Sequence, residues 1–142
     1  TGETLQKGLI ESGYDPQKRS FFILEGLVPY LPKQNFENLL SFLAGDAGGE
    51  NEMVFDYLPP DVIDGTSIRI EAQSMYSEVK SYGECFRLGF EPGELKKVLK
   101  DNGLTILEDI SAPELKPLYF RGNSVDRPVT PIFRFVHAKE AK

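Results

Sequence analysis

The chain has 142 residues, with 22 Asp or Glu against 16 Lys or Arg, which gives a formal net charge of −6 at pH 7. This length fits one domain, and the acidic balance lacks the basic footprint that nucleic-acid phosphates or anionic lipids require. A hydrophobic content of 40% is enough for a packed core. One cysteine and one histidine can form neither an internal disulfide nor a Cys/His zinc site. We therefore expect an acidic, soluble, cytoplasmic protein without nucleic-acid or membrane partners.

The first half of the chain alternates between helical and strand patterns. Leucines at helical spacing predict a helix over 3–12, and the apolar run 20–25 is typical of a strand buried on both faces. Pro32 and the apolar residues that follow it at i, i+3, i+4 and i+7 spacing predict a helix over 32–45. A second apolar strand is expected over 52–57. This alternation favours an α/β three-layer sheet.

The second half ends differently, with two strands that no helix separates. Helical spacing predicts helices over 68–82 and 92–102, the latter ended by Gly103. Strands are expected over 104–110 and 131–137, with a proline-containing loop over 113–128 between them. Because no helix is predicted between these last two strands, we expect them to pair antiparallel.

Glu25 is the first candidate for a functional residue, because it closes the apolar strand 20–25. In open α/β sheets, ligands bind at the carboxyl ends of the strands. A carboxylate there can accept hydrogen bonds from a ligand's ammonium or hydroxyl groups, and Gly26 lets a ligand approach the backbone. The alternative interpretation is a strand-end carboxylate that caps amides of the following loop.

Asp56 and Tyr57 repeat this arrangement at the end of the strand 52–57. Here the alternative is a solvated loop carboxylate beside a half-buried tyrosine. Tyr30 either lines a pocket or packs beneath the helix that follows it.

Other reactive side chains suggest structural roles. We expect Cys85 to be a small buried side chain, Arg134 to pair with an acidic neighbour, and His137 to lie at the surface. The sequence lacks a phosphate-binding G-x-x-x-x-G-K-[ST] or G-x-G-x-x-G loop and a G-x-S-x-G nucleophile elbow. No catalytic residue is therefore assigned, and no metal site is expected.

A longer pattern connects these residues. The segment 13–32, with Glu25-Gly26 and Tyr30-Leu31 after an apolar strand, resembles the leucine carboxyl methyltransferase family. It is most similar to the bacterial branch of S-adenosylmethionine-dependent O-methyltransferases, often linked to polyketide biosynthesis. Segments 54–57, 82–90, 102–109 and 133–138 agree in order and spacing, so the resemblance covers nearly the whole chain.

The resemblance implies the C-terminal half of a class I, Rossmann-like methyltransferase sheet. Residues 1–142 would form a single partial domain that corresponds to the family's fourth to seventh strands, the last one antiparallel. The family's glycine-rich loop and the acidic residues near the cofactor's ribose and adenine have no counterpart in this chain. Glu25, with Gly26 beside it, would lie near the methionine end of S-adenosylmethionine, and Tyr30, Asp56 and Tyr57 would face the methyl acceptor.

Several expectations follow from this partial match. The chain begins at Thr1 rather than methionine, and we expect a fragment, a split half or a natural truncation that is inactive alone. A carboxylate or an acidic phenol is mildly favoured as the acceptor, because other hydroxyls need a general base and Tyr30, Asp56 and His137 are weak candidates. The strand 21–25 would lack its partner and promote self-association. The alternatives are a non-catalytic interaction module that uses the exposed sheet edge and a small-molecule binding protein.

Overall fold

The computed structural model describes residues 5–45 and 51–141, which form a mixed four-stranded sheet. The strand order is β1 (Phe21–Leu24), β2 (Glu52–Tyr57), β4 (Arg134–Glu140) and β3 (Leu104–Ser111). β1 and β2 are parallel, whereas β4 runs antiparallel to both of its neighbours. The expected α/β class and the antiparallel pairing of the last two strands are therefore confirmed.

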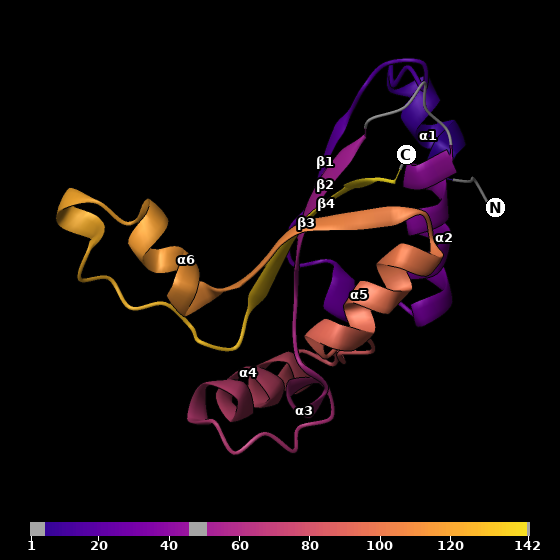
Figure 1. The fold of residues 1–142 in the computed structure, drawn as a ribbon. Coiled ribbons are helices and arrows are strands. Elements are labelled where there is room, and N and C mark those ends of the chain that lie inside the picture. The colour runs from indigo at the N-terminus through magenta and orange to yellow at the C-terminus, as the bar shows by residue number, and fades with distance from the viewer. Residues whose placement is uncertain (1–4, 46–50, 142) are drawn as a thin grey trace.

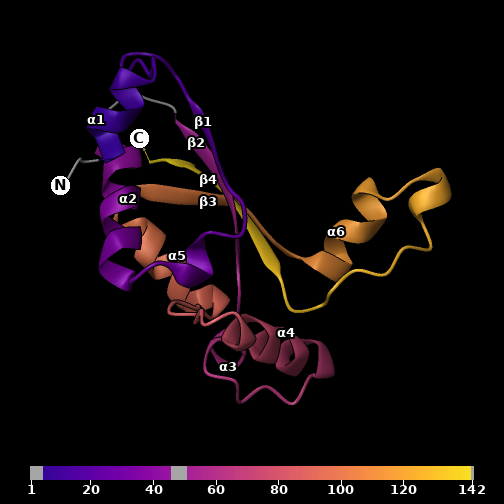
Figure 2. The same cartoon turned by 180° about the vertical axis from the view of Figure 1, so that it is seen from behind.

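One face of this sheet is covered by α1 (Leu5–Glu11), α2 (Lys33–Gly45) and α5 (Pro92–Asp101), which lie on the same side in both ribbon views (Figures 1 and 2). The predicted helical stripes supply the contacts, because apolar side chains of α2 and α5 meet those of the strands. The core that results contains these fully buried side chains: Phe36, Leu40, Phe55, Phe90, Leu95, Leu99 and Val136.

The opposite face of the sheet is open in the part of the chain that the structure describes. Along β1, Phe22 and Leu24 pack against the core, whereas Phe21 is 55% exposed and Ile23 is 70% exposed. The expectation that the run 20–25 is buried on both faces is therefore wrong, because no described helix covers this second face. Among residues 5–45 and 51–141, β1 also pairs on one edge only, with β2.

A smaller unit lies beyond the end of the sheet and contains α3 (Pro60–Ile63) and α4 (Ile70–Ser81) (Figure 1). It has its own small core, formed by Leu58, Val62, Ala72 and Ile132. α4 begins two residues after the predicted start at Ile68, and the side chain of Ile68 is 93% exposed. In the described ranges, no helix combines the length and the apolar character needed to cross a membrane.

The segment between β3 and β4 forms an arm that extends away from the sheet (Figure 1). We predicted a loop here, but the arm contains α6 (Ala112–Tyr119) and the short 3₁₀ helix η2 (Gly122–Ser124). Ser111 and Glu114 start α6 with a capping box, in which each side chain accepts a hydrogen bond from the other residue's backbone amide. Pro113 lies in the first turn, where its missing N–H removes no helical hydrogen bond.

Candidate functional site

The two predicted carboxylates meet at one edge of the sheet. Because β1 and β2 are parallel, their carboxyl ends lie side by side, and this places Glu25 near Asp56. The backbone amide of Gly26 donates a hydrogen bond of 2.6 Å to Oδ1 of Asp56. A hollow of about 260 Å³ opens here, lined by Glu25, Gly26, Asp56, Phe133 and Phe135.

A second hollow of about 190 Å³ lies along the open face of the sheet and shares Glu25, Asp56 and Phe135 with the first. Its remaining lining comes from β1 and β2: Ile23, Leu24, Val54 and Phe55. Together the two hollows form a mostly apolar surface with two carboxylates at its end. We call this surface the strand-end site.

Asp56 is the buried acid of the strand-end site, with a side chain only 6% exposed. Burial raises its pKa above the ordinary value, the hydrogen bond from Gly26 acts in the opposite direction, and the charge of Glu25 raises the pKa further. Asp56 is therefore not the solvated carboxylate of the alternative interpretation. It is a carboxylate that binds a proton more strongly than a free aspartate does.

Glu25 and Gly26 form the open side of the site. Glu25 is exposed and makes no hydrogen bond or ion pair with any described residue. Gly26 adopts a φ of +62°, in the left-handed region that favours glycine, and a Cβ added there would meet nothing within 4 Å. The position thus combines an unengaged carboxylate with an accessible stretch of backbone.

Tyr57 lies on the other face of β2, because successive side chains of a strand alternate. Its buried hydroxyl donates a 2.9 Å hydrogen bond to Oδ2 of Asp109 and accepts one of 3.0 Å from Nε of Arg134. Arg134 in turn pairs with Asp109 at 2.9 Å, which confirms its expected acidic partner. Burial and the neighbouring Asp109 raise the pKa of Tyr57. The structure therefore does not bring Tyr57 into the strand-end site.

Tyr30 also lies apart from both hollows. It belongs to the 3₁₀ helix η1 (Val28–Tyr30), where its half-buried ring packs 5.3 Å from the ring of Phe86. Burial, and to a smaller extent the charge of Glu84, raise its pKa. The ring thus has a packing role against Phe86 in the segment after α4, whereas the expected partner was the helix that follows Tyr30. His137 lies on the open face, with Nε2 at 2.7 Å from Glu52.

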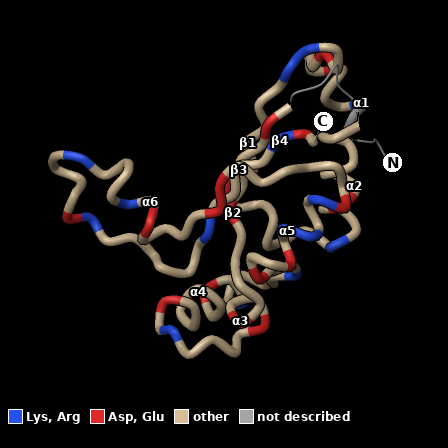
Figure 3. The backbone as a smooth tube through the Cα atoms, viewed as in Figure 1, with Lys and Arg blue, Asp and Glu red and all other residues tan. Residues whose placement is uncertain are grey.

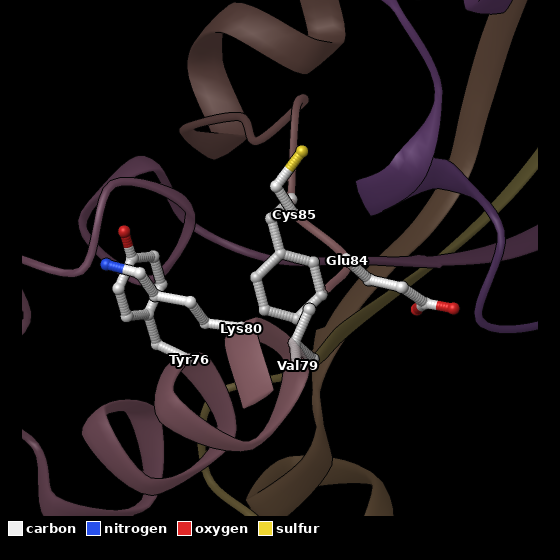
Figure 4. Close-up of a pocket in the computed structure, with 6 residues that line it drawn as sticks. Tyr76, Val79, Lys80, Glu84 and Cys85 are labelled. Carbon is white, nitrogen blue, oxygen red and sulfur yellow. The ribbon is translucent and has the colours of Figure 1, made fainter. Parts of the chain in front are cut away.

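A further hollow of about 100 Å³ lies beside α4 and is lined by Tyr76, Val79, Lys80, Glu84, Cys85 and Phe86 (Figure 4). Its polar groups do not converge, because Glu84 points away from Tyr76 and Lys80 (Figure 4). The Lys80 ammonium lies 6.0 Å from the centre of the Tyr76 ring. Cys85 is exposed, contrary to the expected burial. The strand-end site is thus the better candidate for chemistry.

Acidic positions gather near the centre of the sheet, around β2 and β3, whereas α5 and the arm carry both signs of charge (Figure 3). We did not predict Phe133 and Phe135 as site residues. Their spacing of two, which places both on one face, was the available signal.

Comparisons with known proteins agree with the sequence resemblance. The family model described as Leucine carboxyl methyltransferase matches residues 1–44, which supports the resemblance seen in the sequence. A curated relative from Bacillus subtilis (strain 168), the putative S-adenosyl-L-methionine-dependent methyltransferase YktD, is 26% identical over 132 residues. The match covers 92% of this chain and 42% of YktD, so the chain spans about two fifths of the length of this relative.

Solved structures share the fold at low sequence identity. A DUF574 family protein from Streptomyces avermitilis MA-4680 matches with a TM-score of 0.62 and 8% identity, over 93% of this chain and 48% of that one. The pyocyanin biosynthetic protein PhzM matches with a TM-score of 0.53 and 14% identity, over 94% of this chain and 37% of PhzM. The complex of LepI with SAM matches with a TM-score of 0.52 and 12% identity, over 89% of this chain and 27% of LepI. In each case the chain corresponds to less than half of the other protein.

Proposed function

We propose that this chain is the acceptor-side part of an S-adenosylmethionine-dependent O-methyltransferase. The observation that carries the proposal is the meeting of Glu25 and Asp56 at the carboxyl ends of two parallel strands, beside an apolar hollow. Ligands of open α/β sheets bind at this edge. The similarity to YktD supports the same class of reaction.

The residues present suit the amino-acid end of the cofactor. Glu25 offers an unengaged carboxylate for an ammonium group, and Gly26 leaves its backbone accessible. When bound, S-adenosylmethionine supplies a methyl group on a positively charged sulfur. Phe133 and Phe135 would exclude water from the acceptor, and correct alignment of two reactants contributes about 7–11 kcal/mol to the barrier reduction in favourable cases.

The proposed enzyme needs more than this chain. The open face exposes the side chains of Phe21 and Ile23, and the outer edge of β1 has no described strand partner. Both features are expected of an interior strand of a larger sheet whose neighbours are not present. We propose that the rest of a longer methyltransferase covers them, either as part of the same polypeptide or as a second subunit. The 142 residues alone would then bind the cofactor poorly and remain inactive.

Titration calorimetry with S-adenosylhomocysteine tests this function. We expect binding by the product of the complete gene, whatever its length, and binding at least about tenfold weaker by these 142 residues. Glu25→Gln in the complete product should weaken binding about tenfold or more, because the ammonium loses its charged partner. Glu78→Gln on the exposed side of α4 is the matched control and should leave the affinity unchanged.

Failure of the complete gene product to bind S-adenosylhomocysteine would contradict the methyltransferase proposal. The second candidate function would then be favoured, namely a non-catalytic module that binds a protein through the open sheet edge. The observation behind this candidate is the exposure of two large apolar side chains, Phe21 and Ile23, on an edge strand.

The free edge also leads us to propose that the isolated chain self-associates through the strand 21–25. Sedimentation velocity should show a concentration-dependent dimer or larger species. Ile23→Lys should shift the chain towards monomer, because a charged side chain opposes edge pairing. Ile68→Lys serves as the control, since Ile68 is also exposed but lies outside the sheet. A monodisperse wild-type monomer would contradict self-association.

A further inference from the structure

We infer that the methyl acceptor is a neutral, largely apolar hydroxyl compound, and that the Asp56 carboxylate takes its proton. This inference rests on the proposed function and narrows it, because sequence alone left carboxylate and hydroxyl acceptors open. It depends on three observations: the charges that line the strand-end site, the hydrogen bonding of Asp56, and the aromatic walls.

The charges of the site disfavour an anionic acceptor. Glu25 and Asp56 both line the hollow, and none of its described lining residues is Lys, Arg or His. Arg134 is adjacent in sequence to two of the lining residues, but its guanidinium is held on the other face by Asp109 and Tyr57. Without the cofactor, a carboxylate ligand would therefore meet two like charges and no compensating cation from the described chain. With Glu25 paired to the cofactor's ammonium, the like charge of Asp56 would still face a carboxylate acceptor.

Asp56 has the geometry of a base. Its side chain is nearly buried beside the apolar wall, and the Gly26 amide fixes Oδ1 at 2.6 Å. No described side chain donates a hydrogen bond to this carboxylate, so it retains acceptor capacity for a ligand hydroxyl. Burial raises its pKa, which improves the match to a weakly acidic hydroxyl.

The aromatic side chains that line the hollow indicate the kind of ring system that the acceptor carries. Phe133 and Phe135 present aromatic surface on one side of the hollow, and such rings favour flat apolar partners. In the reaction, an electron pair of the acceptor oxygen forms the new O–CH₃ bond while the carbon–sulfur pair stays on sulfur. The hydroxyl proton passes to Asp56, which returns it to solvent after the ether product leaves.

A pair of probes with one ring system and different polar groups tests the inference without the cofactor. 2-Naphthol and 2-naphthoate carry the same ring system, one with a neutral hydroxyl and one with a carboxylate. Each is titrated into the ¹⁵N-labelled chain while the amide signal of Gly26 is followed. At about pH 7.5, we expect 2-naphthol to shift this signal and 2-naphthoate to bind at least about tenfold more weakly.

Asp56→Asn identifies the source of the discrimination. The substitution should strengthen 2-naphthoate binding several-fold, because it removes one of the two like charges. It should leave the ring contacts of 2-naphthol in place. Asp64→Asn, at an exposed position outside the hollow, is the matched control and should change neither affinity. The amide spectrum of each variant reports whether it folds.

A pH series on the wild-type chain gives an independent measurement if Asp56→Asn fails to fold. As the pH falls from about 7.5, protonation of Asp56 should increase the affinity for 2-naphthoate. It should weaken the binding of 2-naphthol, because a neutral carboxyl group accepts the naphthol hydrogen bond less strongly than a carboxylate does. Glu25 is the other titratable group that lines the hollow, and Glu25→Gln separates its contribution.

Two outcomes would overturn the inference. One is 2-naphthoate binding as tightly as 2-naphthol, and the other is the absence of binding by both probes. Neither outcome depends on S-adenosylhomocysteine, so failure of this inference is distinguishable from failure of the proposed methyltransferase.

Discussion

The two faces of β2 differ in what they contribute to the protein. On one face, Met53, Phe55 and Tyr57 are at most 1% exposed and pack in the core. On the other, Val54 and Asp56 line the open hollows. Because side chains alternate along a strand, the six residues of β2 both fill the core and line the open hollows. The comparison indicates that the packed core lies on the helix-covered face and the candidate site on the open one.

Truncation of one apolar side chain on each face gives the largest expected contrast. Phe55→Ala should lower the free energy of unfolding by about 3–5 kcal/mol, because it leaves a cavity in the core. Ile23→Ala should change it by no more than about 0.5 kcal/mol, since Ile23 is 70% exposed. Urea denaturation at low protein concentration measures both values. A large loss for Ile23→Ala would show that the open face is covered in solution.

A smaller effect is expected from the polar network on the covered face. Tyr57→Phe removes the hydroxyl that bonds to Asp109 and Arg134, and it should cost about 1–2 kcal/mol of stability. The cost stays moderate because Asp109 and Arg134 still pair directly at 2.9 Å. Tyr82→Phe, at a side chain that is 75% exposed, should have no measurable effect in the same experiment. Equal losses for the two variants would mean that the network contributes nothing.

The smallest expected effect concerns two carboxylates of the open face, Asp56 and Glu52, whose contributions to the free energy of unfolding should depend on pH in opposite directions. The raised pKa of Asp56 means that its folded state binds the proton more tightly, so its contribution to stability falls as the pH rises from 3.8 through the folded pKa. Glu52 has a lowered pKa, first because of its hydrogen bond from His137 and then that from Arg19. Its contribution is present above the ordinary value of 4.5 and is lost as the pH falls through the folded pKa.

Thermal unfolding of two variants over this pH range measures these contributions. Relative to wild type, Asp56→Asn should gain stability as the pH rises, and Glu52→Gln should lose it. Differences of the same sign for both variants would contradict the assignment.

Much of the fold could be predicted, because most elements carry a local signal. β2 and α5 follow apolar periods that determine their burial, and the antiparallel pairing of β3 and β4 follows from the missing helix between them. α6 was missed because Pro113 and Pro117 suggested a loop. The capping box of Ser111 and Glu114 was a competing signal in the same segment.

The site could be predicted only in part, because it depends on the pairing of distant segments. Glu25 and Asp56 were found from their places at strand ends. The hydrogen bond that joins Gly26 to Asp56 spans 30 residues, and no local pattern encodes it. Tyr57 was grouped with Asp56 by adjacency, although adjacent residues of a strand face opposite ways.

The arm has a mechanical consequence for the strand-end site. The outgoing and returning ends of the arm meet at its base, where the amide of Ala112 donates a 3.0 Å hydrogen bond to the carbonyl oxygen of Phe133. Directly below, Arg134 and Asp109 tie β4 to β3. These contacts hold the base of the arm against the sheet, and Phe133 is part of that base. The wall of the hollow that Phe133 forms is therefore anchored independently of the exposed outer part of the arm.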